Sequence, residues 1–352
     1  MTRRRFQPGR FLLLLLTFAT LAAAAARLPA AGEPPPGRVR LRVLYGRYLT
    51  FAPLAIASAE GFFDAQGLDV ELVHTTGSVD TTPLLIRGEI DVSAGMLRIS
   101  DFNAIARGAT LRLVADKGHY EDGPCVSAAF LIRPAFLKTK NLESPENLRG
   151  ARVAVTPLGF SEYVLETLVN SKGLALSDLN LVHLQTPLMT TALVDGSLDF
   201  LHVPEPYLTP TLRSGSAVVW KPVREIVPGG QLAAVIYGPN LLVKNRETGR
   251  RFMVAYLQGV RQYNLGKTPR NVEIISRETR LEPGLVRDAC WESIRPDGKI
   301  NVESVLDYQR WAVRRQLLDA VLPPERFWDP FFVDEAGRLL GAKSSATTPG
   351  TR

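Results

Sequence analysis

The chain has 352 residues, 45% of them hydrophobic and 22% charged, a composition typical of a globular protein rather than a disordered or fibrous one. This length allows two domains with a sizeable core. The formal net charge of +7 is concentrated at the start, because residues 1–30 hold five arginines and no acid, so the rest of the chain carries only +2. The remaining basic residues alternate with acidic ones, which excludes the clustered positive surface of a nucleic-acid-binding protein.

The N-terminus has the pattern of a secretory signal peptide. Four arginines precede an apolar run over residues 11–26, and small residues follow around a cleavage point after Ala26 or Ala30. The apolar run is short for a bilayer core, which needs about 20 residues. We therefore predict that residues 1–30 direct export to the periplasm and are removed, and that residues 31–38 form a linker.

From residue 39 onward, short β-rich runs alternate with helical runs, the pattern of an α/β protein with mainly parallel sheets. In the first part we expect strands over 40–45, 68–74, 90–94 and 111–115, and helices over 53–60, 80–87 and 99–107. In the second part we expect strands over 151–155, 179–184 and 198–203, and helices over 161–172 and 190–195. Two further strands, at 130–133 and 241–244, are expected to flank the second lobe and mark the crossings between lobes.

One junction between helix and strand occurs twice. Gly88 followed by Asp91 recurs as Gly196 followed by Asp199, and both pairs are separated by 108 positions. The glycine supplies a left-handed helix cap, and the aspartate leads an apolar strand. Two copies in the same β-α-β-α-β order predict two lobes of similar build.

The remainder of the chain is expected to be mostly helical, over 247–264, 271–279, 284–293 and 302–322. An aromatic segment over 327–332 is expected to pack onto the first lobe. We therefore predict a discontinuous lobe 1 over 39–127 and 245–342, a lobe 2 over 128–244, and a disordered tail over 343–352.

Several segments resemble the NitT/TauT-type solute-binding proteins of ABC importers, the SsuA/THI5-like (NMT1-like) group. They are AIASAEGFF over 55–63, LLIRGEIDV over 84–92, LRGARVAV over 148–155, and 199–207 with its VPEPY ending, in the order found in that family. The resemblance implies an α/β, bilobed periplasmic-binding-protein (type II) fold with two doubly wound, mainly parallel sheets and a helical C-terminal part. It implies capture of a small organic solute, anionic or aromatic or heterocyclic, and delivery to an ABC permease in the inner membrane. We expect a monomer that is not an enzyme and has no cofactor or metal.

Ligands of open α/β sheets bind at the carboxyl ends of the strands, where two facing lobes line one cleft. Hydroxyl and small residues there leave backbone N–H groups free for a carboxylate or sulfonate, aromatic rings stack on a flat group, and Arg98 offers a planar fork to an anion. Arg98 can equally pair with Asp101, and the same loop residues are common in plain turns. The candidates in lobe 1 are Tyr48, Thr50, Phe51, Thr76, Gly77, Ser78, Gly95, Met96 and Arg98.

The candidates in lobe 2 follow the first and third of its expected strands: Thr156, Gly159, Phe160, Ser161, Glu205 and Tyr207. The segment 186–190 follows the second strand, and His74, His183 and His202 also lie at or near strand ends, where a histidine can contact the ligand. Ser161 is also a suitable helix N-cap, which would commit its hydroxyl to the backbone. Glu205 either accepts a hydrogen bond from an amine or ring N–H of the ligand or is a solvated acid at the rim.

Other kinds of site find little support in the sequence. The segment Gly159-Phe160-Ser161-Glu162-Tyr163 lacks the second glycine of G-x-S-x-G, and no histidine follows His202, which argues against a serine hydrolase. The histidines lack the spacing of metal ligands. Cys125 and Cys290 either form one disulfide or remain two buried thiols. Two alternative functions stay open: a THI5-like pyrimidine-related enzyme on the same fold, and a ligand-sensing protein that feeds a receptor kinase.

Overall fold

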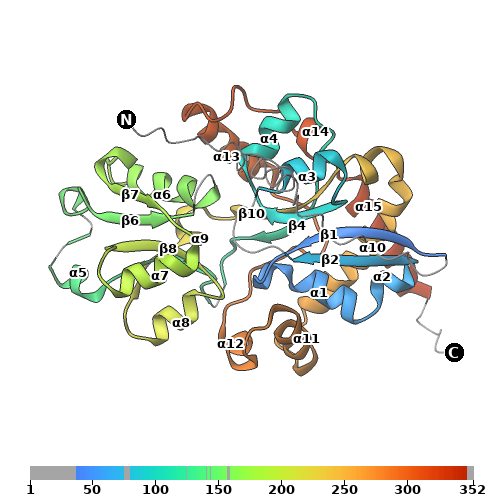
Figure 1. The fold of residues 1–352 in the computed structure, drawn as a ribbon, viewed down its shortest axis with the longest axis horizontal. Coiled ribbons are helices and arrows are strands. Elements are labelled where there is room, and N and C mark those ends of the chain that lie inside the picture. The colour runs from blue at the N-terminus through green and yellow to red at the C-terminus, as the bar shows by residue number, and fades with distance from the viewer. Residues whose placement is uncertain are drawn as a thin grey trace, which may run out of the picture.

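The computed structural model describes residues 37–74, 80–123, 125–139, 141–142, 144–156 and 159–346. These residues fold into two α/β lobes that lie side by side (Figure 1). The predicted signal peptide over 1–30 and all but the last two residues of the predicted linker lie outside the described residues.

Lobe 1 is built on a five-stranded sheet in the order β2-β1-β3-β10-β4. Its first elements along the chain are β1 (Val39–Tyr45), the 3-10 helix η1 (Leu49–Phe51), α1 (Ala52–Ala59), α2 (Phe62–Ala65), β2 (Leu68–His74), α3 (Thr82–Arg87), β3 (Val92–Met96), α4 (Ile99–Ala106) and β4 (Arg112–His119). After lobe 2 the chain returns with β10 (Gln231–Tyr237), the π-helical turn η4 (Asn240–Lys244), α10 (Arg246–Tyr263), α11 (Pro269–Thr279), α12 (Pro283–Asp288), α13 (Val302–Arg314), α14 (Pro324–Phe327) and α15 (Phe331–Ala346).

Lobe 2 is built on a second five-stranded sheet in the order β7-β6-β8-β5-β9. Its elements are β5 (Ala128–Ile132), α5 (Pro134–Thr139), η2 (Pro145–Asn147), β6 (Arg152–Val155), α6 (Phe160–Asn170), η3 (Leu176–Asp178), β7 (Asn180–His183), α7 (Thr186–Val194), β8 (Phe200–Pro204), α8 (Leu208–Arg213), β9 (Val218–Pro222) and α9 (Val223–Ile226). The α/β class and the two-lobed architecture predicted from the sequence are confirmed.

Each sheet is mainly parallel, as the sequence predicted, with one strand that runs in the opposite direction. In lobe 1, β1 pairs in parallel with β2 and β3, whereas β10 pairs antiparallel with β3 and β4. In lobe 2, β6 pairs in parallel with β7 and β8, whereas β5 pairs antiparallel with β8 and β9. The two antiparallel strands, β5 and β10, are the ones that directly follow a crossing from the other lobe.

The return strand β10 also moves the boundary of lobe 2. We predicted that lobe 2 extends to residue 244, but Val235 of β10 lies opposite Ala94 and Ala115 of lobe 1. The last strand of the second sheet, β9, ends at Pro222. The expected strand over 241–244 is wrong, because these residues form η4, whose first backbone N–H groups donate back to the carbonyl of Gly238.

The repeated Gly/Asp junction has the same backbone conformation and the same type of hydrogen bond in both lobes. Gly88 and Gly196 have φ angles of +70° and +84°, the left-handed conformation that glycine adopts readily. The Asp91 carboxylate accepts the backbone N–H of Arg42 at 2.7 Å, and the Asp199 carboxylate accepts that of Arg152 at 2.8 Å. Each aspartate therefore fixes the start of its strand against a neighbouring parallel strand, β1 in lobe 1 and β6 in lobe 2, as two lobes of similar build require.

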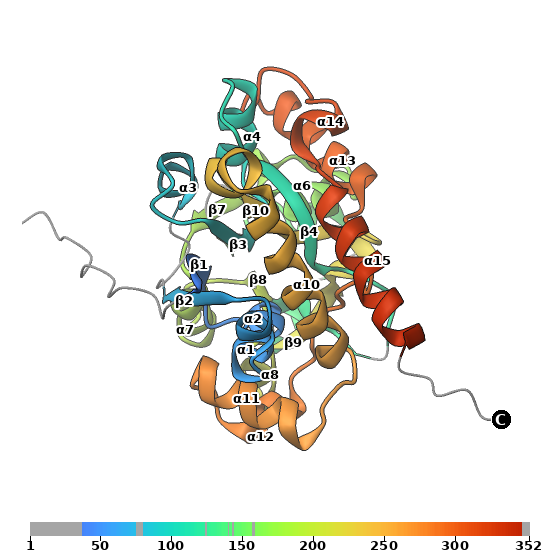
Figure 2. The ribbon, with the colours of Figure 1, turned by 90° about the vertical axis from the view of Figure 1, so that its right-hand side faces the viewer.

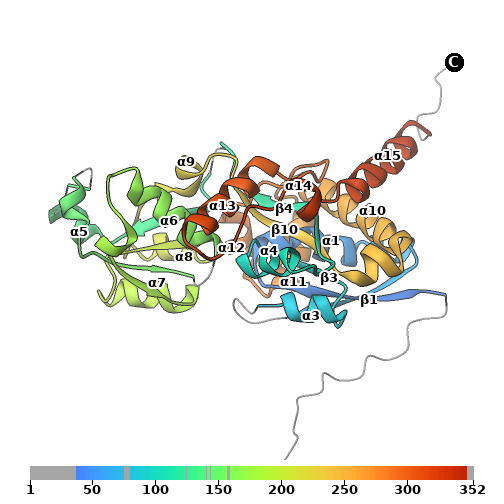
Figure 3. The ribbon, with the colours of Figure 1, turned by 90° about the horizontal axis from the view of Figure 1, so that it is seen from above.

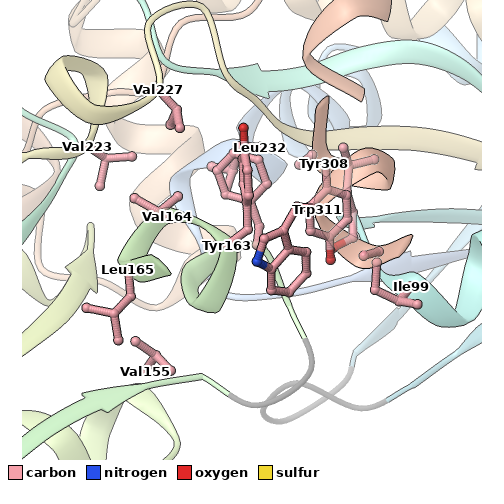
Figure 4. Close-up of a cluster of buried hydrophobic side chains, with 14 of the residues drawn as sticks. Ile99, Val155, Tyr163, Val164, Leu165, Val223, Val227, Leu232, Tyr308 and Trp311 are labelled. Carbon is pink, nitrogen blue, oxygen red and sulfur yellow. The ribbon is translucent and has the colours of Figure 1, made fainter. Parts of the chain in front are cut away.

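Helix α13 lies over the junction between the lobes in two perpendicular views (Figures 1 and 3). Figure 4 shows Tyr308 and Trp311 of this helix beside Tyr163 of α6 and Ile99 of α4. The ring of Tyr163 lies 5.6 Å from that of Tyr308 and 5.7 Å from that of Trp311, measured between centroids. One continuous hydrophobic core thus joins the two lobes on this side.

The C-terminal segment packs on lobe 1, as predicted. The ring centroid of Phe327 lies 6.0 Å from that of Phe102, and the centroid of Phe332 lies 4.9 Å from that of Tyr237. Helices α10 and α15 pack against each other on the face of lobe 1 seen in Figure 2. Because α15 runs to Ala346, residues 343–346 of the predicted tail are helical, and residues 347–352 lie outside the described part.

A disulfide joins Cys125 to Cys290, which decides between the two alternatives that the sequence left open. Cys125 lies in the crossing from β4 to β5, and Cys290 follows α12. The bond therefore ties one crossing between the lobes to the C-terminal part of lobe 1. None of the described helices is both long and apolar enough to span a bilayer.

Candidate functional site

A pocket lies between the lobes, and about 690 Å³ of space free of protein atoms lies in and around it, open solvent included. Lobe 1 lines it with residues from the carboxyl ends of β1, β3 and β4: Leu44, Gly46, Tyr48, Phe51, Gly95, Met96, Arg98 and Lys117. Lobe 2 lines it with residues at or just after the ends of β6, β7 and β8: Thr156, Thr186, His202 and Pro204. The cavity thus lies where both sheets present their strand ends, as expected for a ligand site of this architecture.

Lys117 provides a buried amine at the lobe 1 side of the cavity. The residue is 1% exposed, its Nζ donates to Thr50 Oγ1 at 2.7 Å, and it lies 3.6 Å from the centroid of the Phe51 ring. Burial lowers the pKa of Lys117 to about 7, although the carboxylates of Glu292 and Asp116 act in the opposite direction. An anion in the cavity would restore the full charge of this amine.

Asp116 holds the strand segment that carries Lys117. Its carboxylate is fully buried and accepts hydrogen bonds from the amide of Gln231 at 2.7 Å and from the backbone N–H groups of Gly118 and Arg295. The ring of His119 lies 2.8 Å from the same carboxylate. Because Asp116 and Lys117 are neighbours on β4, the hydrogen bonds to the Asp116 carboxylate also hold the backbone that carries Lys117.

Arg98 is the second cation of the cavity and follows β3 at the start of α4. Its Nη1 lies 3.4 Å from Thr81 Oγ1, and among the described residues it forms no ion pair. The predicted competitor Asp101 instead accepts from Thr82 Oγ1 at 2.7 Å. The backbone of Arg98 pairs with that of Gly159 in an isolated antiparallel bridge, so the two lobes touch at this side of the cavity.

Aromatic and hydroxyl side chains close another side of the cavity. The Tyr48 ring lies edge-on to the Tyr207 ring of lobe 2, with 6.2 Å between centroids. Tyr48 also forms a side-chain hydrogen bond with Thr186, and burial raises the pKa of its phenol. These contacts join the end of β1 to the elements of lobe 2 that carry Thr186 and Tyr207.

His202 is a buried polar group on the lobe 2 side of the cavity. It is 4% exposed, and neither ring nitrogen has a hydrogen-bond partner among the described residues. Burial lowers the pKa of its imidazole to about 4, so the ring is uncharged at neutral pH.

Six predicted site residues line the cavity: Tyr48, Phe51, Gly95, Met96, Arg98 and Thr156. Thr50 lies behind them as the acceptor for Lys117, Gly159 bridges to Arg98, and Tyr207 contacts Tyr48. Thr76, Gly77 and Ser78 lie outside the described residues.

Three other predicted residues are not among those that line the cavity. Phe160 is 1% exposed and its ring packs 5.7 Å from that of Tyr308 in the core. Ser161 is not the N-cap of α6, and its hydroxyl hydrogen-bonds with that of Thr156 at 2.5 Å. The buried Glu205 carboxylate accepts from Thr209 Oγ1 and from the backbone N–H of Cys290, so its partners are internal, and burial raises its pKa.

The site predicted from the sequence omits Lys117, because the expected strand over 111–115 stops before it, whereas β4 extends to His119 and brings Lys117 to a strand end. Thr186 and His202 lie at strand ends that the sequence indicated, although neither was among the selected candidates. No group of His, Cys, Asp and Glu within the described ranges has the geometry of a metal site.

Comparison with known sequences gives one family and one curated relative. The model of the family described as NMT1/THI5 like matches residues 49–264. The "Putative thiamine biosynthesis protein" of Haemophilus influenzae is 26% identical over 148 residues, which is 42% of this chain. The match spans 44% of the length of that relative.

Comparison with solved structures confirms the fold. The ligand-binding component of an ABC-type import system from Staphylococcus aureus, solved with zinc bound, is 16% identical with a TM-score of 0.70, covering 86% of this chain and 100% of that one. The periplasmic aliphatic sulphonate binding protein SsuA of Escherichia coli is 16% identical with a TM-score of 0.64, covering 83% and 92%. The desulfurization enzyme DSZB is 14% identical with a TM-score of 0.57, covering 86% and 100%. The chain therefore has the fold of periplasmic solute-binding proteins, a fold that an enzyme also uses.

Proposed function

This chain belongs to the NMT1/THI5-like family, and on that premise we propose that it is the periplasmic solute-binding component of an ABC importer. It is exported through the signal peptide over residues 1–30, captures a small organic anion in the cavity between the lobes, and delivers it to a permease in the inner membrane. The observation that carries this proposal is the pair of cations, Lys117 and Arg98, in a cavity lined by both lobes.

The electrostatics of the cavity favour an anion. Lys117 is almost fully buried, and Arg98 has no carboxylate partner among the described residues. Acidic neighbours act on both cations, Glu292 and Asp116 on Lys117 and Asp80 and Asp101 on Arg98, but in the described part of the chain none forms an ion pair with them. A carboxylate or sulfonate placed between the two cations would offset part of the cost of burying them. Hydrogen bonds to charged groups are worth about 1.5–3 kcal/mol each, so removing one costs roughly 10- to 150-fold in affinity.

Because both lobes line the cavity, we expect the lobes to close around a captured solute. A solute that touches Lys117 of lobe 1 and Thr156 of lobe 2 makes more contacts when the lobes are together than when they are apart. It therefore shifts the protein toward the closed form by the difference in those contacts. The closed form would then be recognised by the permease through the outer surfaces of the lobes.

The proposal is tested by calorimetric titration of wild type, Lys117→Met and Lys138→Met with a panel of organic carboxylates and sulfonates. Lys138 is exposed on α5, at the far end of lobe 2 from the cavity (Figure 1), and serves as the matched control. We expect wild type and Lys138→Met to bind the same anion and Lys117→Met to bind it at least about tenfold more weakly. Equal affinity in all three proteins would contradict the proposal.

A second candidate is an enzyme on this fold. Two observations favour it: the likeness to a desulfurization enzyme, and the amine of Lys117, which is partly uncharged at neutral pH and hence nucleophilic. Mass spectrometry of each panel compound before and after incubation separates the candidates. A bound but unaltered compound supports the binding protein, whereas conversion that is lost in Lys117→Met supports the enzyme.

A further inference from the structure

His202 differs from the other buried histidine of the described chain. The imidazole of His119 lies 2.8 Å from the Asp116 carboxylate, whereas both ring nitrogens of His202 lack a protein partner. The closest ring contact of His202 is with Phe130, at 5.6 Å between centroids, and a phenyl ring in that position satisfies neither nitrogen. His202 also lines the cavity, so a solute bound there can supply the missing hydrogen bond.

The chemical character of His202 limits what it recognises. Burial keeps the imidazole uncharged, so it offers one N–H donor and one acceptor nitrogen and no charge. The charged groups that line the same cavity, Lys117 and Arg98, come from lobe 1. A solute that satisfies all three therefore has an anionic group toward lobe 1 and an uncharged polar group toward lobe 2.

The other lining residues suit a flat ring that joins the anionic group of the solute to its uncharged polar group. Tyr48 and Phe51 are aromatic, and Leu44, Met96 and Pro204 are apolar. Aromatic side chains favour stacked or edge-on contact with a planar group. An inorganic anion or a short alkyl anion would leave this surface and His202 without contacts.

We propose that His202 is a specificity-determining residue that hydrogen-bonds an uncharged hydroxyl, amino or ring N–H group of the solute. The solute class is accordingly an aromatic or heteroaromatic monoanion with such a group, rather than a simple alkanesulfonate or an inorganic anion. This inference rests on the proposed function of the cavity as an anion-binding site.

Matched pairs of ligands test the proposal: 4-hydroxybenzoate against benzoate and 4-hydroxybenzenesulfonate against benzenesulfonate, with ethanesulfonate and nitrate as simple anions. Titrations use wild type, His202→Phe, which keeps a ring but removes both nitrogens, and His202→Asn, which keeps a donor and an acceptor. His183→Phe is the control, because His183 is a partly exposed histidine on β7 that does not line the cavity. Circular dichroism and thermal unfolding verify that each variant is folded.

We expect wild type to prefer at least one hydroxylated ligand over its unsubstituted partner by about tenfold or more. The preference should disappear in His202→Phe and be restored in part in His202→Asn, while His183→Phe behaves as wild type. A folded His202→Phe protein that keeps the preference would overturn the role of His202, as would a wild type that binds ethanesulfonate alone. Both results leave the proposed function standing, whereas a wild type that binds nitrate alone, or no anion of the panel, overturns the proposed function and this inference together.

Discussion

Replacing Asp199 with Asn tests how the repeated junction stabilises lobe 2. Asp199 is 7% exposed. Its carboxylate lies 2.8 Å from Nη2 of both Arg133 and Arg152 and also accepts a hydrogen bond from the backbone N–H of Arg152. Burial alone would raise the pKa of this carboxyl, but the hydrogen bonds from the two arginines lower it from 3.8 to about 2.

The lowered pKa sets both the size of the effect and its dependence on pH. A shift from 3.8 to about 2 corresponds to at most about 2.4 kcal/mol of stability at pH 7. Because the Arg152 side chain is 42% exposed, solvent screening reduces the expected loss in Asp199→Asn to about 1–2 kcal/mol. The folded-state pKa lies below the unfolded one, so this stability is present above pH 3.8 and declines as the pH falls toward 2.

Urea unfolding of wild type and Asp199→Asn at pH 7 and at pH 3 measures this difference. We expect the gap between the two proteins to shrink by about half at pH 3. Asp91→Asn is the matched variant in lobe 1, where the carboxylate accepts the Arg42 backbone N–H but, among the described residues, forms no arginine ion pair. A loss for Asp91→Asn equal to that for Asp199→Asn, or a gap that stays constant with pH, would refute the reasoning.

Three further predictions follow from the structure. Breaking the bond between Cys125 and Cys290 by double serine substitution should lower the free energy of unfolding by about 2–5 kcal/mol, because the bond closes a long loop, and an unchanged urea midpoint would contradict this. Affinity for an anionic solute should fall between pH 7 and pH 9 as Lys117 loses its proton, with proton uptake on binding detected by calorimetry in two buffers; a flat profile would count against the role of Lys117. Trp311→Phe removes the indole N–H that donates to Glu166 at 2.7 Å and should cost about 1–2 kcal/mol in thermal unfolding, whereas no change would show that this contact between α13 and α6 adds nothing.

The sequence predicts the two lobes well because the residues that specify their strands and helices are close together in the chain. Gly88 and Asp91, like Gly196 and Asp199, stand three residues apart and specify a cap and a strand start without reference to the rest of the chain. The lobe to which β10 belongs is not encoded locally, because its residues pair with Ala94 and Ala115, more than 100 positions away. The predicted boundary at residue 244 was wrong for that reason.

The candidate site shows the same difference between residues predicted from local sequence and residues whose position depends on distant parts of the chain. The expectation that ligands bind at the carboxyl ends of strands located Tyr48, Gly95 and Thr156, because the positions of these loops follow directly from the order of strands and helices. It missed Lys117 because the stretch around it is polar and resembles a loop. Its strand conformation depends on the buried Asp116 carboxylate, whose partner Gln231 is 115 positions away in the sequence.

The central claim is that the cavity between the lobes binds an organic anion, and blocking that cavity tests it most directly. A Cβ on Gly95 would lie 3.9 Å from the Arg98 guanidinium and meet nothing closer, so the backbone accepts Gly95→Leu while the added side chain fills the cavity. Gly337 on α15 has no neighbour within 4 Å of the same position and provides the control Gly337→Leu. Calorimetric titration with the anion that wild type binds should give unchanged affinity for Gly337→Leu and a loss of about tenfold or more for Gly95→Leu. Equal affinity in wild type, Gly95→Leu and Gly337→Leu would show that the anion binds elsewhere and would contradict the account.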